Sequence, residues 1–385
     1  MIPYGCQDIR REDIDAVEQV LRSDWLTQGP AIGRFEAELA GYCGASHGVA
    51  VNSATSALHI ACLALGLGPG DRLWTSPNTF VASANCGLYC GAEVDFVDID
   101  PRSYNLCPKA LEAKLAQAAT EKRLPKIVIP VHFAGQSCDM RAIHELSRRY
   151  GFAVIEDASH AVGGRYLDQP VGNCRYSDIT IFSFHPVKII TTAEGGMALT
   201  NDAALAVRMA RLRSHGITRD EQEMDGMAEG PWYYQQTELG FNYRITDIQA
   251  ALGLSQLHRL DAYVERRHAI ARRYDQLLAD LPVTLPWQSP DAHSAHHLYP
   301  IQVDTSHAIR GRREVFERLR AAGIGVNVHY IPVHCQPYYR RLGFKPGDFP
   351  VAEHYYVGAI SLPMYPGLAE AEQDQVVLAL QKALS

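Results

Sequence analysis

The sequence predicts an α/β fold, with a mostly parallel sheet in a large domain and a smaller α+β domain after it. Two observations favour this fold class. Short apolar runs rich in β-branched residues alternate with helical patterns between residues 47 and 200. The chain has 385 residues, 47% of them hydrophobic, which is long for one compact core. We expect an N-terminal arm and a large domain over residues 1–250, and a connecting helix and a small domain over residues 251–385.

The predicted strands are short and almost entirely apolar, as strands are when helices cover both faces of a sheet. They are HGVAVNS (47–53), EVDFVDID (93–100), KIVIPVHF (126–133), FAVIED (152–157) and ITIFSF (179–184). Helical patterns separate them. In residues 139–150 apolar side chains recur at helical spacing, and Gly151 follows as a stop signal.

The second half of the chain has a different pattern. Residues 215–237 are polar, contain glycines and lack a clear period, so we expect a long loop there. Residues 247–280 have a helical pattern with few breakers and contain the expected connection between the domains. A strand (HHLYPIQV, 296–303) and a helix (311–323) then belong to the small domain.

Composition and charge exclude several classes of partner. The formal net charge is -7 and the basic residues are scattered, so we expect no nucleic-acid partner. No apolar run approaches the roughly 20 residues that cross a bilayer, and the N-terminus lacks the pattern of a signal peptide, so we expect no membrane partner. The nine cysteines include no C-x-x-C pair. This pattern favours reduced thiols in a cytoplasmic protein.

Lys188 stands in the string TIFSFHPVKIITTAEGGMALT, in a polar loop between two strand-like runs. A lysine just beyond a buried strand is partly desolvated, which lowers the pKa of its amine and makes the amine available as a nucleophile for a Schiff base. Taken alone, the pattern is more typical of a lysine in a surface loop. Lys188 becomes a candidate nucleophile only together with other segments.

Two acids, Glu156 and Asp157, end the strand FAVIED. Ligands of open α/β sheets bind at the carboxyl ends of the strands. A carboxylate there could keep the pyridine nitrogen of a cofactor protonated, and we choose Asp157 for this role. Asp157 could equally be the N-cap of a helix that begins after it, and both roles could coexist.

A helix is predicted to begin near Thr55, directly after a strand that ends at Asn52 or Ser53. The free backbone N–H groups of its first turn and the hydroxyls of Thr55 and Ser56 would bind a phosphate, or serve only as ordinary caps. The segment contains neither G-x-x-x-x-G-K-[ST] nor G-x-G-x-x-G. This argues against nucleotide hydrolysis and against dinucleotide binding.

Weaker signals come from aromatic, amide and histidine side chains. Phe80 could stack on a planar ring, although an aromatic at a helix start is more often part of the core. Asn242 and Arg244 precede a helix and could reach a phosphate, or cap and solvate that helix. The string NVHYIPVHCQPYY (327–339) suits a polar sugar or nucleotide, or a subunit interface. We expect no metal at a histidine triplet that lacks a suitably spaced cysteine or carboxylate: His293, His296 and His297.

In this order, the strings DWLTQGP, NSATSALH, FSFHPVKIITTAEGG, HYIPVH and SLPMYP resemble the DegT/StrS family of sugar aminotransferases over essentially the whole chain. Within the family they look closest to the members that act in pseudaminic acid synthesis. The resemblance implies the type I fold of enzymes that depend on pyridoxal 5'-phosphate (PLP), which is the fold of aspartate aminotransferase. It also implies PLP as cofactor and a homodimer with shared active sites. The retained Lys188 argues against the dehydrase branch of the family, in which a histidine replaces it.

The resemblance implies roles for individual residues by position. Lys188 matches the catalytic lysine that forms a Schiff base with PLP, and Asp157 matches the acid that pairs with the pyridine nitrogen. His160 matches a residue near the ring hydroxyl, Phe80 matches the ring-stacking aromatic, and Asn242 matches an asparagine from the neighbouring subunit. The implied phosphate cradle is Ala54, Thr55, Ser56 and Ser183. The implied sugar-nucleotide contacts are Tyr4, Asp24, Trp25, Leu26, Thr27, Val328, His329, Tyr330 and Ile331.

The reaction that the resemblance implies is a transamination with L-glutamate as amino donor. The implied acceptor is a UDP-linked keto sugar, UDP-2-acetamido-2,6-dideoxy-β-L-arabino-hex-4-ulose. The product would be UDP-4-amino-4,6-dideoxy-N-acetyl-β-L-altrosamine. Two alternatives stay open: an aminotransferase for another nucleotide 4-keto sugar, such as a UDP-4-keto-pentose or the GDP-perosamine precursor, and a non-catalytic regulator on the same fold. The presence of both Lys188 and Asp157 argues against the regulator.

Overall fold

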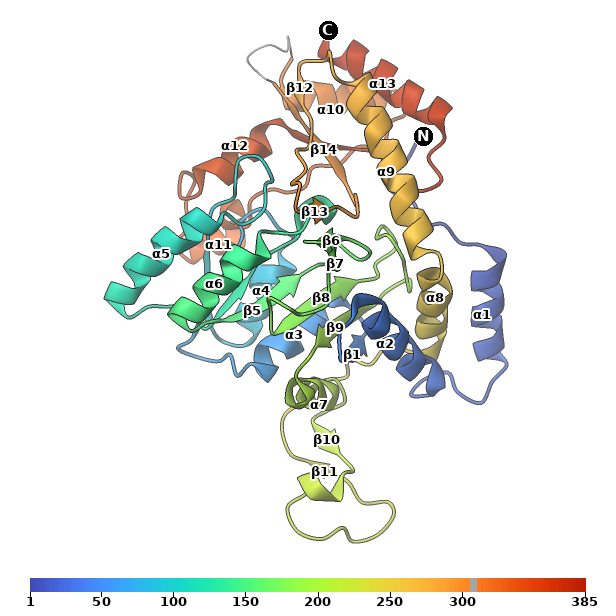
Figure 1. Ribbon diagram of the computed structural model, residues 1–385, viewed down its shortest axis with the longest axis vertical. Helices are drawn as coiled ribbons and strands as arrows, with labels where there is room; N and C mark the ends of the chain where they lie inside the picture. The colour runs from blue at the N-terminus through green and yellow to red at the C-terminus, as the bar shows by residue number, and fades with distance from the viewer. Residues whose placement is uncertain (305–309) are drawn as a thin grey trace.

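A seven-stranded sheet forms the centre of the computed structural model, which describes residues 1–304 and 310–385 (Figure 1). Its strands lie in the order β1, β9, β8, β5, β4, β2, β3. Their bounds are β1 (His47–Val51), β2 (Arg72–Thr75), β3 (Glu93–Phe96), β4 (Ile127–Ile129), β5 (Ala153–Asp157), β8 (Ile179–Ser183) and β9 (Gly196–Thr200). In this sheet only β9 is antiparallel to its neighbours. The predicted α/β fold with a mostly parallel sheet is therefore confirmed.

Helices cover both faces of this sheet. Successive residues of β1 belong to different cores: Val49 and Val51 pack in one cluster and Ala50 in another, because side chains of a strand alternate between faces. One face packs against α3 (Ala54–Ala64), α4 (Ala82–Tyr89) and α7 (Ala203–Leu212). The other packs against α2 (Pro30–Cys43), α5 (Pro108–Glu121), α6 (Met140–Tyr150) and α8 (Asp247–Leu257). Gly151 ends α6 in the left-handed conformation at φ 77, as predicted.

A second, smaller sheet lies in the C-terminal part of the chain. It is antiparallel and has the order β12 (Val283–Thr284), β14 (Tyr299–Val303), β15 (Ala359–Leu362). Its core is shared with α9 (Leu260–Leu277), α10 (Arg312–Ala321) and α13 (Glu370–Leu384). Ile2 also packs in this core, and Gly325 donates its backbone N–H to the Ile2 carbonyl at 2.6 Å. The first residues of the chain thus lie on the small sheet.

Further helices and strands lie outside the two sheets described above. They are α1 (Arg11–Leu21), α11 (Pro337–Arg341), α12 (Pro350–Gly358), β6 (Arg165–Tyr166), β7 (Gln169–Pro170) and β13 (Ala292–His293). Among the described residues, none of the helices has the length and apolar character that crossing a membrane requires. All nine cysteines are free thiols.

Two predicted elements differ from the structure. Residues 247–280 form two helices instead of one: α8 ends at Leu257 and α9 begins at Leu260. The break allows α8 to pack against α1 and α2 while α9 packs in the small-sheet core. The predicted loop of residues 215–237 contains a two-residue antiparallel ladder, β10 (Ile217–Thr218) with β11 (Gln235–Gln236). This segment projects from the body of the molecule beyond α7 (Figure 1).

Candidate active site

A cavity of about 540 Å³ lies at the carboxyl ends of the parallel strands. Asp157 and Ser183, the last residues of β5 and β8, line one side of it. The start of α3 lines a second side. Residues 327–330 of the C-terminal part, together with Tyr4, form a third side of the cavity. Five segments that are separate in the sequence thus meet at the sheet edge where ligands of α/β folds bind.

Lys188 lies in the loop that follows β8 and lines the cavity. Its backbone N–H donates to the carbonyl of His185 at 2.9 Å, which closes a tight turn. Burial lowers the pKa of the Lys188 amine to about 8, although the negative charge of Asp157 opposes this shift. A substantial fraction of this amine is therefore neutral near neutral pH, as a nucleophile requires.

Asp157 is held on both carboxylate oxygens. Ser83 donates its hydroxyl to Oδ2 at 2.6 Å, and Ser159 donates its hydroxyl to Oδ1 at 2.6 Å and its backbone N–H at 3.1 Å. The chain after Asp157 forms turns rather than a helix. The alternative role as a helix N-cap is therefore wrong, and the contact with Ser159 is instead an Asx turn.

The first turn of α3 presents free amide groups to the cavity. Ser53 is the N-cap and accepts the Ser56 N–H at 3.1 Å. The backbone N–H groups of Ala54 and Thr55 have no hydrogen-bond partner among the described residues, and both residues line the cavity. Gly196 packs closely against this turn, since a Cβ there would lie 2.5 Å from the Ala54 nitrogen. Ser53 therefore caps this helix start and leaves two amide groups available for an anion.

Histidine and tyrosine rings form a further wall. The His160 Nδ1 accepts the backbone N–H of Ala134 at 3.3 Å, so the ring proton lies on Nε2, which donates to the Tyr330 hydroxyl at 3.1 Å. Burial and the charge of Lys188 hold the pKa of His160 well below its usual value, so the ring is neutral. Phe80 lines the cavity with 60% of its surface exposed, so it is not the core aromatic of the alternative interpretation.

The structure brings together most of the residues that the sequence singled out. Eleven of them line the cavity: Tyr4, Ala54, Thr55, Phe80, Asp157, His160, Ser183, Lys188, Val328, His329 and Tyr330. Ser56 lies just outside it, with its hydroxyl donating to the Asn52 side chain at 2.7 Å. The remaining candidates do not line the cavity of their own chain: Asp24, Trp25, Leu26, Thr27, Asn242 and Ile331. Trp25 and Ile331 are 55% and 46% exposed.

Several cavity residues were not predicted from the sequence. They include Ser159, His185, Glu194, His297 and Asn327. Ser159 follows Asp157 by two residues, the spacing of an Asx turn, and this signal could have identified it. No local pattern singles out His185, Glu194, His297 or Asn327 within its own segment. Their position at the cavity depends on contacts between distant segments.

The histidine triplet does not converge on one point. The ring of His297 packs on His160 with a centroid distance of 4.4 Å, whereas His293 and His296 pack on His268 at 4.1 and 4.5 Å. Within the described ranges, side chains with metal-ligand chemistry come close together at His334, Cys335 and Glu353. There the His334 Nε2 lies 2.8 Å from a Glu353 oxygen, which is a hydrogen-bond distance. The expectation of no metal stays a prediction.

The donor set of the cavity fits one kind of cofactor. A partly neutral lysine amine suits an aldehyde, and a carboxylate fixed by two serines suits a protonated ring nitrogen. Free N–H groups at a helix start suit a phosphate. The exposed face of Phe80 suits a planar ring. Pyridoxal 5'-phosphate carries all four of these groups.

Comparison with known proteins points to the same chemistry. The DegT/DnrJ/EryC1/StrS aminotransferase family matches residues 7–381. The spore coat polysaccharide biosynthesis protein SpsC of Bacillus subtilis is 42% identical over 383 residues, which are 99% of this chain and 96% of that protein.

Solved structures of similar proteins share the whole fold. Helicobacter pylori PseC, an aminotransferase involved in the biosynthesis of pseudoaminic acid, superposes with a TM-score of 0.91 at 31% identity, over 100% of this chain and 99% of that chain. The putative sugar aminotransferase Spr1654 of Streptococcus pneumoniae in its PMP-form has a TM-score of 0.90 at 31% identity, over 100% and 99% of the two chains. Spr1654 has also been solved in its PLP-form. The predicted type I fold is confirmed by these neighbours.

Proposed function

The chain belongs to the DegT/DnrJ/EryC1/StrS aminotransferase family, whose members depend on PLP, and we propose that it transfers an amino group from L-glutamate to a nucleotide-linked 4-keto-6-deoxy sugar. The observation that carries this proposal is the meeting of Lys188, Asp157 and the free N-terminus of α3 in one cavity. These groups match the aldehyde, ring nitrogen and phosphate of PLP.

Each residue of the cavity has a distinct task in this proposal. Lys188 would bind the cofactor through its amine, and Asp157 would accept a hydrogen bond from the protonated ring nitrogen and so keep that nitrogen charged. Ala54 and Thr55 donate their backbone N–H groups to the phosphate, with Ser183 beside them. PLP, when bound, supplies a ring that withdraws electrons from the carbon next to the transferred amine. His160 would lie near the ring hydroxyl, and Phe80 would cover the ring face.

Lys188 also moves the proton of the reaction. With the cofactor and glutamate bound, the Lys188 amine would take the proton from the donor carbon and hold it for return later in the transfer. A pKa of about 8 suits both directions, because the amine exchanges its proton readily near neutral pH. Donor and acceptor then react in turn at the same place, so the kinetics are ping-pong.

The acceptor in this proposal is UDP-2-acetamido-2,6-dideoxy-β-L-arabino-hex-4-ulose, converted to UDP-4-amino-4,6-dideoxy-N-acetyl-β-L-altrosamine. The end-to-end likeness to PseC supports it. Tyr4, His329 and Tyr330 line the same cavity and would contact the sugar in this proposal. A second candidate is another nucleotide 4-keto sugar, because SpsC, at 42% identity, is named for spore coat polysaccharide synthesis.

A second subunit completes the site in this proposal. Asn242 lies outside the cavity of its own chain, as do residues 24–27. Asn242 and residues 24–27 are exposed. These positions are free to face the cavity of a partner in a homodimer, where Asn242 would reach the phosphate.

Product analysis tests the proposal. The purified protein, loaded with PLP, is incubated with L-glutamate and a panel of nucleotide 4-keto sugars, and NMR gives the configuration at C4 of each aminated product. Turnover of the UDP-linked L-arabino-hexulose above all others is the expected result. Turnover of a different keto sugar alone supports the second candidate, and no change of the visible absorption band on adding glutamate contradicts the aminotransferase proposal.

A further inference from the structure

Glu156 is a buried charged residue for which the proposed reaction has no use. It precedes Asp157 on β5, and consecutive side chains of a strand point to opposite faces. Asp157 lines the cavity and Glu156 does not. Glu156 is 5% exposed. An ionised carboxylate at such depth is unfavourable unless several donors hold it.

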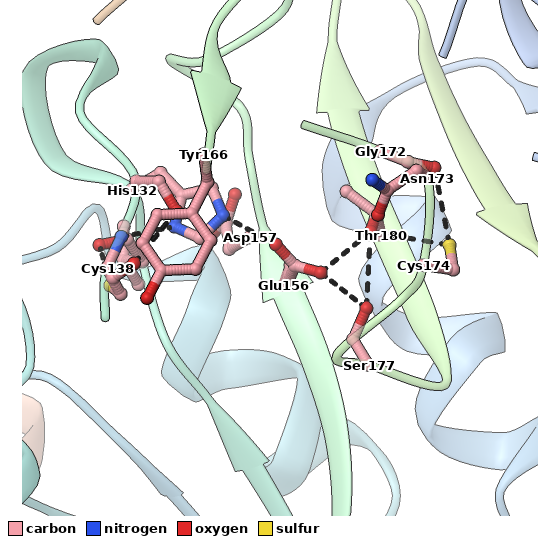
Figure 2. A network of polar contacts seen from close by, with 12 residues as sticks. His132, Cys138, Glu156, Asp157, Tyr166, Gly172, Asn173, Cys174, Ser177 and Thr180 are labelled. Carbon is pink, nitrogen blue, oxygen red and sulfur yellow. Dashed lines mark hydrogen bonds and ion pairs between the residues drawn. The ribbon is translucent and has the colours of Figure 1, made fainter. Parts of the chain in front are cut away.

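Three neutral donors hold the Glu156 carboxylate. Figure 2 shows it between the ring of His132 and the hydroxyls of Ser177 and Thr180. The His132 Nδ1 accepts the backbone N–H of Cys138 at 3.2 Å, so the ring proton lies on Nε2, which donates to Glu156 at 2.7 Å. This arrangement leaves the His132 ring neutral. Glu156 therefore carries a full negative charge that hydrogen bonds stabilise but do not cancel.

The titratable groups around Glu156 support the assignment of a negative charge to its carboxylate. Burial raises the pKa of Glu156, but the hydrogen-bonding and electrostatic contact with His132, together with the hydrogen bonds from Ser177 and Thr180, outweighs burial and brings the pKa below its usual value. The other titratable groups that interact with Glu156 are two thiols, Cys138 and Cys174, whose pKa values burial raises. Across the described parts of the chain, Glu156 has no lysine or arginine partner, and its only charge-capable partner within ion-pair distance is His132.

The same cluster fixes the end of the strand that carries Asp157. His132 donates its backbone N–H to the Asp157 carbonyl at 3.0 Å, and Asp157 donates its own N–H to the carbonyl of Pro130 at 2.9 Å. The side chain of His132 at the same time holds Glu156. The backbone position of Asp157 and the charge of Glu156 thus depend on one residue.

We infer that Glu156 is a positioning residue that acts through Asp157, its charge on the far face of β5 favouring positive charge on the cofactor that the cavity face would hold. The inference rests on the proposed function. From strand geometry, the Glu156 carboxylate and the ring-nitrogen site are roughly 10 Å apart. At that distance and an effective dielectric constant of about 20, one charge shifts the pKa of another group by about one unit.

The test is a pH titration of the visible absorption band of PLP bound to the protein. Glu156→Gln should lower the pKa of this band by about one unit, because removal of a negative charge disfavours the protonated form. Glu156→Asp keeps the charge and should restore most of the wild-type pKa. The matched control is Asp13→Asn, which removes another buried carboxylate held by Ser255, Gln256 and Arg259, and it should leave the pKa unchanged.

A purely structural role for Glu156 predicts a different result. In that case Glu156→Gln would lower the melting temperature while the pKa of the band stayed at the wild-type value, and the inference would be overturned. If the Gln variant does not fold, Ser177→Lys tests the same idea, because Ser177 is partly exposed and a lysine there adds a positive charge beside Glu156. Ser177→Lys should lower the pKa of the band, and Ser177→Ala, its uncharged control, should not. Equal pKa values in these two variants would also overturn the inference.

Failure of the inference and failure of the proposed function are distinguishable. If the wild-type protein binds PLP and glutamate changes the band, but the pKa does not respond to Glu156→Gln, only the inference fails. If the wild-type protein does not bind PLP, or glutamate leaves the band unchanged, the proposed function fails and the inference fails with it.

Discussion

Gly196→Ala should weaken PLP binding, because the first residue of β9 packs against the start of α3. An added Cβ would lie 2.5 Å from the Ala54 nitrogen, 2.6 Å from the Ser53 carbonyl carbon and 2.7 Å from the Ala54 Cα. These are backbone atoms, so no side chain can rotate away. The start of α3 or the strand must move by about 1 Å to reach ordinary contact, and overpacking of this kind costs about 1–3 kcal/mol. If the whole cost falls on the phosphate cradle, PLP binds roughly 5- to 150-fold more weakly.

Titration of the apo-protein with PLP, followed by its visible absorption, gives the dissociation constant, and urea unfolding gives the free energy of unfolding. The loss of PLP binding free energy and the loss of unfolding free energy should together equal the cost of the added methyl group. Gly33→Ala is the matched control, because nothing lies within 4 Å of a Cβ added at this position in α2. An alanine there should leave the dissociation constant unchanged. If Gly196→Ala matched the wild type in both measurements, the reasoning about the helix start would be refuted.

Three further predictions concern the cavity. The neutral fraction of Lys188 rises with pH through a pKa of about 8. The rate of PLP capture by the apo-protein in stopped-flow should therefore rise with a midpoint near pH 8 and level off above it. A midpoint near the usual 10.5 would contradict the burial of this amine. Lys188→Ala should lower the rate of transamination by at least about 10²–10⁴-fold with the folded structure intact by circular dichroism; wild-type turnover with cofactor bound would remove Lys188 from its proposed role. Phe80→Ala should weaken PLP binding by roughly 2- to 13-fold, the value of one aromatic stack. The melting temperature of the apo-protein should not fall, because the ring is 60% exposed. Loss of both PLP affinity and melting temperature would identify Phe80 as a packing residue.

The parallel sheet could be predicted from the sequence because its strands are apolar on both faces. Residues 126–133, 152–157 and 179–184 are mostly apolar, and each segment contains a strand of the sheet. The four-residue strand β2, RLWT, was not predicted, because it is short and begins with an arginine. Its place in the sheet depends on its pairing with β3 and β4.

The break between α8 and α9 could not be predicted, because His258 and Arg259 are compatible with a helix. Tertiary contacts act at this point. Arg259 forms an ion pair with the buried carboxylate of Asp13 at 2.6 Å, and Asp13 is separated from it by more than 200 residues. Such a contact leaves no periodic signal in the sequence.

The candidate site divides in the same way. Asp157 and Lys188 could be singled out because Asp157 ends one predicted strand and Lys188 lies just beyond another. The resemblance to a family then assigned both residues to one site. Ser83, which holds Asp157 from α4, could not be singled out, because a serine within a helix carries no local mark of such a contact. The roles of all these residues stay predictions until the variants are measured.

The order in which the chain leaves the ribosome bears on when the cavity can form. Tyr4, on the cavity wall, accepts the backbone N–H of Met364 at its carbonyl, at 3.0 Å, and Ile2 is held by Gly325. At roughly 5–20 residues per second, synthesis separates these partners by tens of seconds. The large sheet, complete at residue 200, can therefore fold while the first five residues remain without their partners. The substrate side of the cavity is completed last, once nearly the whole chain has been made.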